Sequence, residues 1–259
     1  MEEEKVKEAV RQVFGQNAEK YVSSVSHAQG EDLELLLEWL VPDPSWTVLD
    51  VATGGGHVAK AVAPHVGYVF ATDLTREMLG AAQKHVQASC ENVWFLSADA
   101  EKLPFLDESF DAVTCRIAAH HFPHAERFIQ ETARVLKPGG KLILIDNVVQ
   151  GDERIGHFVN EVERLRDESH GECHSVETWK SWFALNGFTA AKERLRKKTF
   201  DFPSWVRRTA ASEEQVKRVE EYLLRADSDL QQYVGLQLSD SGEILKIQID
   251  EWMVMAVKG

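Results

Sequence analysis

The sequence predicts an α/β protein with a doubly wound, mostly parallel sheet of seven strands and helices on both faces of that sheet. Short apolar runs rich in β-branched residues alternate with segments whose apolar residues recur at helical spacing. Strands that alternate with helices favour parallel pairing, because each helix carries the chain back to the start of the next strand. A parallel sheet of this kind is normally covered on both faces.

The first 45 residues are expected to be helical. The segment 32–40 has apolar residues at helical spacing, and Pro42 and Pro44 end it. Five strands then follow, over residues 47–51, 68–72, 93–96, 110–115 and 141–146. Helices are expected between strands over residues 57–65, 75–88 and 124–136. The last of these ends at Lys137-Pro138-Gly139-Gly140, a typical helix stop and turn.

The pattern after residue 150 is less regular. Helices are expected over residues 152–168 and 175–186, a strand over 190–200, a charged helical stretch over 203–227 and a closing strand over 251–257. No linker rich in Pro, Gly or Ser interrupts the sequence. We therefore expect one domain over residues 1–259, with a helical insertion before the last strand.

The charge balance is acidic, with 29 Lys and Arg against 42 Asp and Glu, which gives a net charge of −13. Nucleic-acid binding requires clustered Lys and Arg, so we expect no nucleic-acid partner. The stretch 192–208 departs from this trend, since its charged residues are mostly Lys and Arg. It is interpreted either as a solvated strand-and-turn surface or as a site for an acidic substrate group or partner.

Three cysteines, Cys90, Cys115 and Cys173, are too few and of the wrong parity for a disulfide scaffold. Reduced thiols indicate a cytoplasmic protein. The N-terminus shows no basic segment followed by an apolar one, as a signal peptide would. No apolar run approaches the roughly 20 residues that a membrane-spanning helix needs.

Ligands of such sheets bind beyond the carboxyl ends of the strands, so the residues that end each strand are the candidates for chemistry. Asp50 ends the first strand, just before Gly54-Gly55-Gly56. The dinucleotide pattern Gly-x-Gly-x-x-Gly is absent, because position 59 is Ala. A carboxylate at this place would repel a pyrophosphate and suits a ligand that carries an ammonium or a sulfonium.

Two further acids follow the next two strands. Asp73 ends the second strand, where an acid can accept hydrogen bonds from ribose hydroxyls; the alternative is a helix cap. Asp99 lies just past the third strand, where it can accept from an exocyclic amine; the alternative is a loop cap. Together with Asp50 and the glycines, these acids favour a nucleoside-binding site.

This constellation resembles the class I S-adenosylmethionine-dependent methyltransferases, within them most closely the small-molecule group that includes menaquinone/ubiquinone C-methyltransferases. The segments that carry the resemblance are Val48–Gly56, Ala71–Leu79, Ala98–Phe105, Phe110–Val113 and Arg134–Gly140, in family order and spacing. The upstream segment Phe14–Tyr21 resembles the N-terminal helix that covers the cofactor in that group. The resemblance implies an N-terminal helical cap over 1–45, a cofactor-binding core over 46–150 and substrate-side helices with closing strands over 151–259.

The resemblance also implies residue roles toward S-adenosylmethionine and its product S-adenosylhomocysteine. The backbone around Ala52, Gly54 and Gly56 would hold the methionine part. Asp73 would bind the ribose hydroxyls. The other implied contacts are Leu74 and Met78 on the adenine, Asp99 and Ala100 at the adenine amine, Arg116 and Ile117 at the methionine end, Asp50 at the first strand end, and Tyr21 from the covering helix. Ala52 stands where the family usually has Gly; because Ala tolerates the β region, we expect a slightly different loop and retained binding.

The exit of the fourth strand, Cys115–Phe122, lacks the Asn/Asp-Pro-Pro-aromatic motif of many enzymes that methylate base or glutamine amino groups. His121 is the candidate general base, and the alternative is that His120 and His121 position the loop or line a pocket. No metal is expected, although His170-x-x-Cys173-His174 is ligand-like. Cys115 is interpreted as core packing and not as a nucleophile.

The expected reaction is in-line methyl transfer to a small, partly apolar organic acceptor, which needs alignment and exclusion of water more than a catalytic constellation. The acceptor pocket is expected between the N-terminal helices and residues 150–185 and 203–245. The aromatic residues that either line it or pack in the core are Trp39, Trp179, Trp182, Phe183 and Trp205. The alternatives are a non-catalytic S-adenosylmethionine-binding protein, a methyltransferase acting on protein or RNA, and a nicotinamide-dependent oxidoreductase. The acceptor atom and the oligomeric state stay open.

Overall fold

The computed structural model describes residues 2–22, 30–150 and 152–259, except for the side chains of residues 2 and 19–21. Its strands are β1 (Thr47–Val51), β2 (Tyr68–Asp73), β3 (Val93–Ser97), β4 (Phe110–Arg116), β5 (Leu136–Val148), β6 (Phe188–Asp201), β7 (Gln237–Leu238) and β8 (Ile244–Lys258). Its helices are α1 (Glu2–Val22), α3 (Glu31–Leu40), α4 (His57–Val62), α5 (Arg76–Gln87), α6 (Ala125–Val135), α7 (Glu153–Arg166), α8 (Val176–Leu185), α9 (Phe202–Val206), α10 (Glu213–Arg225) and α11 (Ser228–Tyr233), with short 3-10 turns η1 (Ala63–His65) and η2 (Ala119–His121).

The strands form one sheet in the order β3-β2-β1-β4-β5-β8-β6. Strands β1 to β5 are parallel, while β8 runs antiparallel to both β5 and β6. The predicted α/β class with a mostly parallel sheet is therefore confirmed. The sheet has eight strands and not seven, because the two-residue strand β7 also pairs with β8. A loop, and not a helix, connects β3 to β4.

Both faces of the sheet are covered. Along β5, Leu142 and Leu144 pack under α6 and α8, whereas Ile143 and Ile145 pack under α3 and α4. This alternation follows from the two-residue period of a strand, which sends successive side chains to opposite faces. An apolar strand that has no polar face is therefore buried on both sides, as the sequence pattern predicts.

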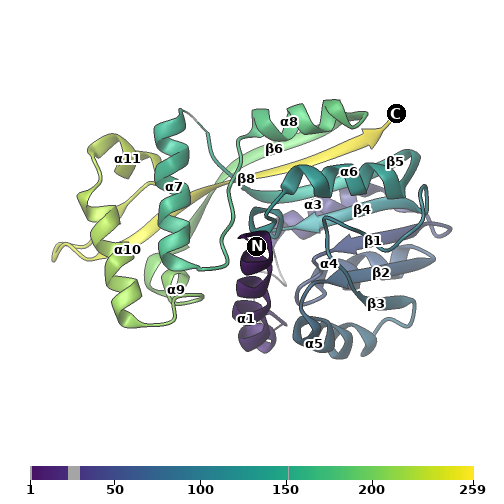
Figure 1. Ribbon diagram of the computed structural model, residues 1–259, viewed down its shortest axis with the longest axis horizontal. Coiled ribbons are helices and arrows are strands. Elements are labelled where there is room, and N and C mark those ends of the chain that lie inside the picture. The colour runs from purple at the N-terminus through teal and green to yellow at the C-terminus, as the bar shows by residue number, and fades with distance from the viewer. Residues whose placement is uncertain (1, 23–29, 151) are drawn as a thin grey trace.

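The last third of the chain adds a helical lobe, made of α7, α9, α10 and α11, at one end of the sheet (Figure 1). Its apolar side chains, such as Val206 and Val219, pack against Ile247 and Ile249 in the first half of β8. The second half of β8 lies between β5 and β6 in the main sheet. One strand thus belongs to both parts of the molecule.

Helix α1 packs on α5, where Ala18 contacts Met78 and Ala81. Figure 1 shows α1 in front of the sheet, between the helical lobe and α5. This position places the N-terminal helix beside the carboxyl ends of the central strands. None of the described helices is both long and apolar enough to span a bilayer.

Candidate functional site

A cavity of about 1040 Å³, here called the first cavity, lies where β1, β2 and β4 end. The carboxyl ends of parallel strands meet there, which is where open α/β sheets bind their ligands. Lys7, Val10 and Phe14 form one wall, because their spacing places them on one side of α1. The predicted contact residues that line this cavity are Asp50, Ala52, Gly54, Asp73, Leu74, Met78, Asp99, Ala100, Arg116 and Ile117.

Asp50 lies at the base of the first cavity, and its side chain is almost fully buried. Its carboxylate accepts hydrogen bonds from the hydroxyls of Thr53 at 2.6 Å and Thr114 at 2.7 Å. Burial raises the pKa of Asp50 to about 6, since desolvation disfavours the charged form. A cationic ligand would offset that cost, which makes this place suited to positive charge.

The loop after β1 turns through left-handed backbone conformations. Ala52 has φ 52° and Gly54 has φ 55°. The expectation that Ala52 adopts the β region is therefore wrong: it occupies a conformation that glycine adopts without strain and alanine does not. The turn brings the backbone amide of Gly54 within 3.0 Å of the Asp73 carboxylate.

Asp73 ends β2 and faces the first cavity. One of its oxygens accepts from the amide of Gly54 at 3.0 Å and the other from the amide of Thr75 at 2.9 Å. Burial raises the pKa of Asp73 to about 6 despite these bonds. A carboxylate oxygen can accept more than one hydrogen bond, so this fixed carboxylate can still receive donors from a ligand.

Asp99 lies in the loop after β3 and is held from two sides. One oxygen accepts from the amide of Glu101 at 2.9 Å, and the other lies 2.8 Å from the ammonium of Lys7. Lys7 also lies 2.9 Å from Glu101 and 2.6 Å from Glu3. Helix α1 is thereby tied to the wall of the first cavity by one buried lysine.

Arg116 ends β4, Ile117 follows it, and both line the first cavity. The guanidinium of Arg116 donates to Asp32 of α3. Burial would raise the pKa of Asp32, but this guanidinium holds it below its usual range. Ile117 has φ 54°, a strained conformation for a β-branched residue, and strain of this kind is often found at functional sites.

Gly56 is the one predicted contact residue, among those whose side chains the structure describes, that does not line the first cavity. Gly56 caps the start of α4 with φ 79°, and a Cβ atom there would lie 2.6 Å from Val86 of α5. Its glycine is thus explained by the turn and by the packing of α4 on α5. The backbone of Tyr21 belongs to α1, but its side chain lies outside the described residues.

Another cavity, of about 620 Å³, adjoins the first and is called the second cavity below. Phe14, Ile117 and His121 line both cavities and so form the boundary between them. The ring of Phe14 packs edge-on against His121, with 4.9 Å between the ring centroids. The other residues that line the second cavity are His120, Asn147, Arg166, Asp167, Lys198, Phe200, Trp205, Arg208, Thr209 and Ile249.

His120 and Asp146 form a buried pair at the edge of the second cavity. Asp146 lies in β5, and its carboxylate binds Nδ1 of His120 at 2.5 Å and the backbone amide of His120 at 2.9 Å. Because a carboxylate only accepts hydrogen bonds, we assign the proton to Nδ1, which leaves Nε2 able to accept another. Burial would lower the pKa of His120, but the Asp146 charge raises it above its ordinary value.

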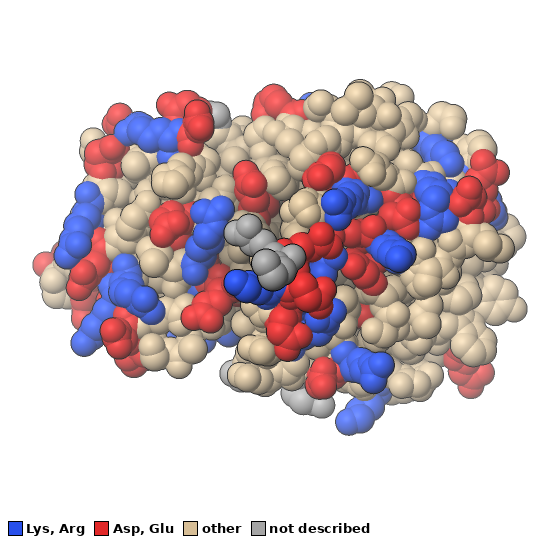
Figure 2. Space-filling model, viewed as in Figure 1, with Lys and Arg blue, Asp and Glu red and all other residues tan. Residues whose placement is uncertain are grey.

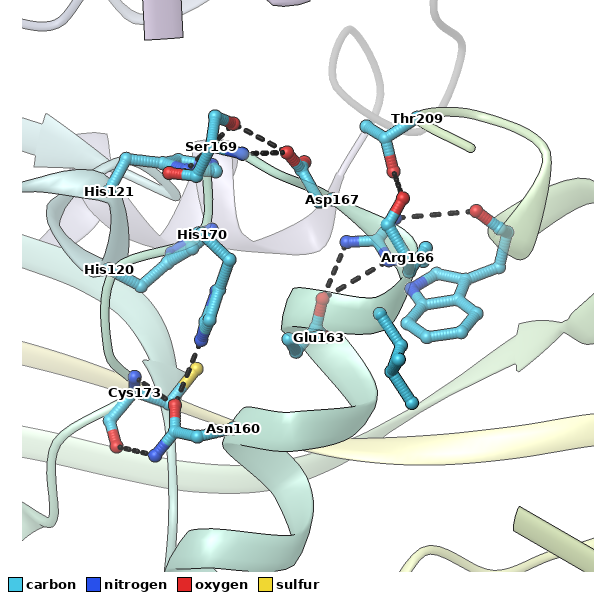
Figure 3. A network of polar contacts seen from close by, with 12 residues as sticks. His120, His121, Asn160, Glu163, Arg166, Asp167, Ser169, His170, Cys173 and Thr209 are labelled. Carbon is cyan, nitrogen blue, oxygen red and sulfur yellow. Dashed lines mark hydrogen bonds and ion pairs between the residues drawn. The ribbon is translucent and has the colours of Figure 1, made fainter. Parts of the chain in front are cut away.

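His121 is held differently. Its Nδ1 lies 2.9 Å from the carbonyl oxygen of Ser169 (Figure 3). Burial and the neighbouring His120 lower the pKa of His121, so it is neutral at pH 7. His170 completes this group and binds Asn160 through Nε2 at 2.9 Å.

The residues that resemble metal ligands do not converge. Within the ranges that the structure describes, no group of three or more His, Cys, Asp or Glu side chains could hold a metal ion. His170 binds Asn160, whereas the ring of His174 packs on Trp182. Cys115 is buried in the sheet, and burial raises the pKa of its thiol, which is the opposite of what a nucleophile needs.

The aromatic residues considered for an acceptor pocket separate into two groups. Trp205 of α9 lines the second cavity. Trp39, Trp179 and Phe183 are core residues, and Trp182 packs against that core. Helical spacing alone could not distinguish these cases, because it reports which face of a helix is apolar but not what covers that face.

Sequence reasoning missed two groups at the site. Asp146 ends the apolar run of the fifth strand, so the strand-end rule that selected Asp50 and Asp73 could also have selected it. Lys7 carries no comparable signal. Its partner Asp99 is 92 residues away, and only the packing of α1 brings the two together.

The sequence is similar to those of known methyltransferases. Residues 49–144 match a family model described as a methyltransferase domain. YcgJ of Bacillus subtilis, described as an uncharacterised methyltransferase, is 32% identical over 246 residues, which cover 95% of this chain and 97% of that protein. A ubiquinone/menaquinone biosynthesis C-methyltransferase of Brucella anthropi is 35% identical over 150 residues, which cover 53% of this chain and 56% of that protein.

A solved structure shows the same fold. The crystal structure of a candidate methyltransferase from Bacillus halodurans C-125 has a TM-score of 0.85 and 35% identity. The match covers 88% of this chain and 99% of that one. The similarity therefore includes the helical lobe as well as the sheet.

Proposed function

Because this chain belongs to the class I methyltransferase family, we propose that it transfers a methyl group from S-adenosylmethionine to a small, partly apolar organic acceptor. The observation that carries the proposal is the position of Asp50, Asp73 and Asp99 around one cavity, with a second cavity directly beside it. The first cavity would take the cofactor and the second the acceptor.

The charge of the first cavity supports this cofactor. Four carboxylates line it (Asp50, Asp73, Asp99 and Glu101), and Lys7 and Arg116 are its only Lys and Arg among the described residues. S-adenosylmethionine carries a sulfonium and an ammonium against one carboxylate, so it suits an acidic cavity. A nicotinamide dinucleotide would bring phosphates against these carboxylates, which disfavours the oxidoreductase alternative.

The residues fit the cofactor as follows. Asp73 would accept from the ribose hydroxyls, and Leu74 and Met78 would pack on the adenine. Asp99, with Ala100 beside it, would accept from the adenine amine. The backbone around Ala52 and Gly54 would hold the methionine part, with Arg116 and Ile117 at that end.

The cofactor supplies a methyl group on a positively charged sulfur; transfer forms a bond from the acceptor to the methyl carbon, and the electron pair of the broken C–S bond stays on a neutral thioether. The protein therefore has to align the acceptor and exclude water more than to stabilise charge. Phe14, Ile117 and His121 lie where the two cavities meet, so they would set that alignment. Helix α1 would shield the transfer from water.

An acceptor that loses a proton needs a base. His121 borders both cavities, but its lowered pKa makes it a weak base. His120 lines the second cavity, and the Asp146 carboxylate raises its pKa. The Asp146 carboxylate stabilises the protonated form of His120, so we assign proton acceptance to His120 and the shaping of the pocket to His121.

Two measurements test the proposal. Calorimetry of the full chain should show S-adenosylhomocysteine binding in the micromolar range, roughly −7 to −8 kcal/mol. Incubation with methyl-labelled S-adenosylmethionine and a fractionated cell extract should place the label in a small metabolite. Absence of binding at millimolar ligand would refute the cofactor, and binding without transfer to any fraction would favour a non-catalytic protein. Label found in protein or RNA alone would contradict the small acceptor.

A further inference from the structure

The second cavity is cationic within an acidic protein. Among the described residues, its charged lining is Arg166, Lys198 and Arg208 against the carboxylate of Asp167, while the whole chain has a net charge of −13. On the molecular face shown in Figure 2, by contrast, Lys and Arg side chains lie interspersed with Asp and Glu. The charged lining of this cavity thus differs from the mixed charges on the face that Figure 2 shows.

The three cations are not equivalent. Arg166 is committed to the wall: it binds Glu163 at 2.6 Å, and its guanidinium lies 4.2 Å from the ring centre of Trp205. Lys198 of β6 lies 3.2 Å from Glu251, but Arg196 binds the same carboxylate at 2.5 Å. Arg196 also lies 3.5 Å from Glu31 and 3.5 Å from Asp32, so Lys198 lines the cavity as one member of a larger network of ion pairs.

Arg208 follows α9 and is half-buried at the lining of the second cavity. Its neighbour Arg207 is exposed and points to Glu213, which it binds at 2.8 and 2.9 Å. Arg208 thus lines the second cavity, whereas Arg207 is directed to the surface.

The cavity also has polarity along its length. Figure 3 shows His120 and His121 at one side of the polar network and Arg166 and Thr209 at the other. The histidine side adjoins the first cavity. Apolar side chains complete the lining, from Phe200, Trp205 and Ile249. A ligand that fits this arrangement has an apolar body and a charged group remote from its reacting atom.

We propose that the second cavity binds a methyl acceptor that carries an anionic group, a carboxylate or a phosphate, which Arg208 and Lys198 hold while its reacting atom faces His121 and Ile117. This inference rests on the proposed function, because it assigns the acceptor class to the cavity beside the cofactor site. Arg suits planar carboxylates and phosphates, with which it can form two parallel hydrogen bonds, and Lys adds a point charge.

The test uses the full chain saturated with S-adenosylhomocysteine and three probes: benzoate, phenyl phosphate and the neutral benzamide. Binding is measured by calorimetry at constant ionic strength. At least one anionic probe should bind ten times more tightly than benzamide, and its preference over the other anion distinguishes a carboxylate site from a phosphate site. Arg208→Gln and Lys198→Met should each weaken anion binding at least fivefold.

The matched control is Arg207→Gln, which removes the adjacent arginine and should leave anion binding within twofold. Unchanged affinity for S-adenosylhomocysteine shows that a variant is folded, and Lys198→Met serves if Arg208→Gln fails that check. Equal binding of benzamide and the anions would overturn the inference, and so would equal losses in Arg207→Gln and Arg208→Gln. Failure to bind S-adenosylhomocysteine would instead refute the proposed function.

Discussion

The ammonium of Lys7 lies 2.8 Å from the carboxylate of Asp99, so one ion pair joins the N-terminal helix to the loop after β3. Replacing Lys7 by Met removes this pair and leaves the carboxylates of Asp99 and Glu101 without their shared cation. We expect S-adenosylhomocysteine to dissociate faster. The activation free energy of dissociation should fall by roughly 1.5–3 kcal/mol, the range typical of hydrogen bonds to charged groups. Stopped-flow chase experiments measure the rate. Arg11→Met, which removes two ion pairs at the surface of the same helix, should leave the dissociation rate unchanged.

Asp73→Ala should weaken S-adenosylhomocysteine binding by about 1.5–3 kcal/mol, because the ribose hydroxyls lose a charged acceptor. The protein should still fold, since Asp73 lies at a strand end and not among the apolar contacts of the core. Calorimetry gives the affinity and thermal melting the stability. Normal melting with unchanged affinity would move the ribose to another residue.

The affinity for S-adenosylhomocysteine should depend on pH through Asp73. In the free protein, burial raises its pKa to about 6, and ribose hydroxyls donate more strongly to the carboxylate than to the protonated acid. Affinity should therefore be constant above about pH 7 and fall as the pH drops through 6, approaching one proton taken up for each ligand released. Titrations in buffers of different ionisation enthalpy count that proton. A fall of the same size in Asp73→Ala would assign the effect elsewhere.

The same raised pKa values have the opposite sign for folding. Asp50 and Asp73 bind protons more tightly in the folded chain than in the unfolded one, where an Asp titrates near pH 4. Their contribution to the free energy of unfolding is thus fully present below about pH 4 and is lost as the pH rises through 6. Urea titrations of the ligand-free protein between pH 4 and 7 should show less of this loss in Asp50→Asn.

His120→Gln should slow methyl transfer by about 10²-fold or more if the acceptor must lose a proton, the usual scale for a general base. His121→Ala should slow it far less, because that side chain shapes the boundary between the cavities. Single-turnover rates with bound S-adenosylmethionine separate the two variants, and neither should change cofactor affinity strongly. A larger loss in His121→Ala would return the role of base to that residue.

Ala52→Gly should stabilise the protein, by up to about 1 kcal/mol, because it relieves a left-handed conformation that costs a side chain roughly that amount. Ala61→Gly, inside helix α4, should destabilise it by a similar amount, since glycine loses more conformational freedom in a helix. Chemical denaturation measures both. Destabilisation by Ala52→Gly would mean that the methyl group of Ala52 contributes more than its strained backbone costs.

Much of the first cavity could be predicted from sequence because its residues end strands. The chain order of Asp50, Asp73 and Asp99 follows the order of three parallel strands, whose carboxyl ends must meet at one edge. The pairing of His120 with Asp146 was not predictable in this way. It joins a turn to the neighbouring strand across 26 residues, and its geometry depends on sheet register.

The second cavity is harder still to derive from sequence. It exists because the helical lobe packs beside the sheet. Arg208, Lys198 and His121 are far apart in the sequence, and only the fold brings them to the lining of one cavity. The sequence did mark 192–208 as basic, but it could not say which of those cations face inward. Arg207 and Arg208 are chemically identical neighbours, and only the course of the chain after α9 separates their roles.

Strand β8 extends from the helical lobe into the main sheet and pairs with β6 along most of its length. Neither strand contains Gly or Pro, so this two-stranded ribbon offers no ready point at which φ and ψ could change enough for hinge motion. Opening the molecule between lobe and sheet would require breaking the regular pairing of β6 with β8, which runs from Lys192 to Asp201 of β6. The lobe and the sheet should therefore move as one unit, and motions that widen the first cavity should be those of α1, which forms one of its walls.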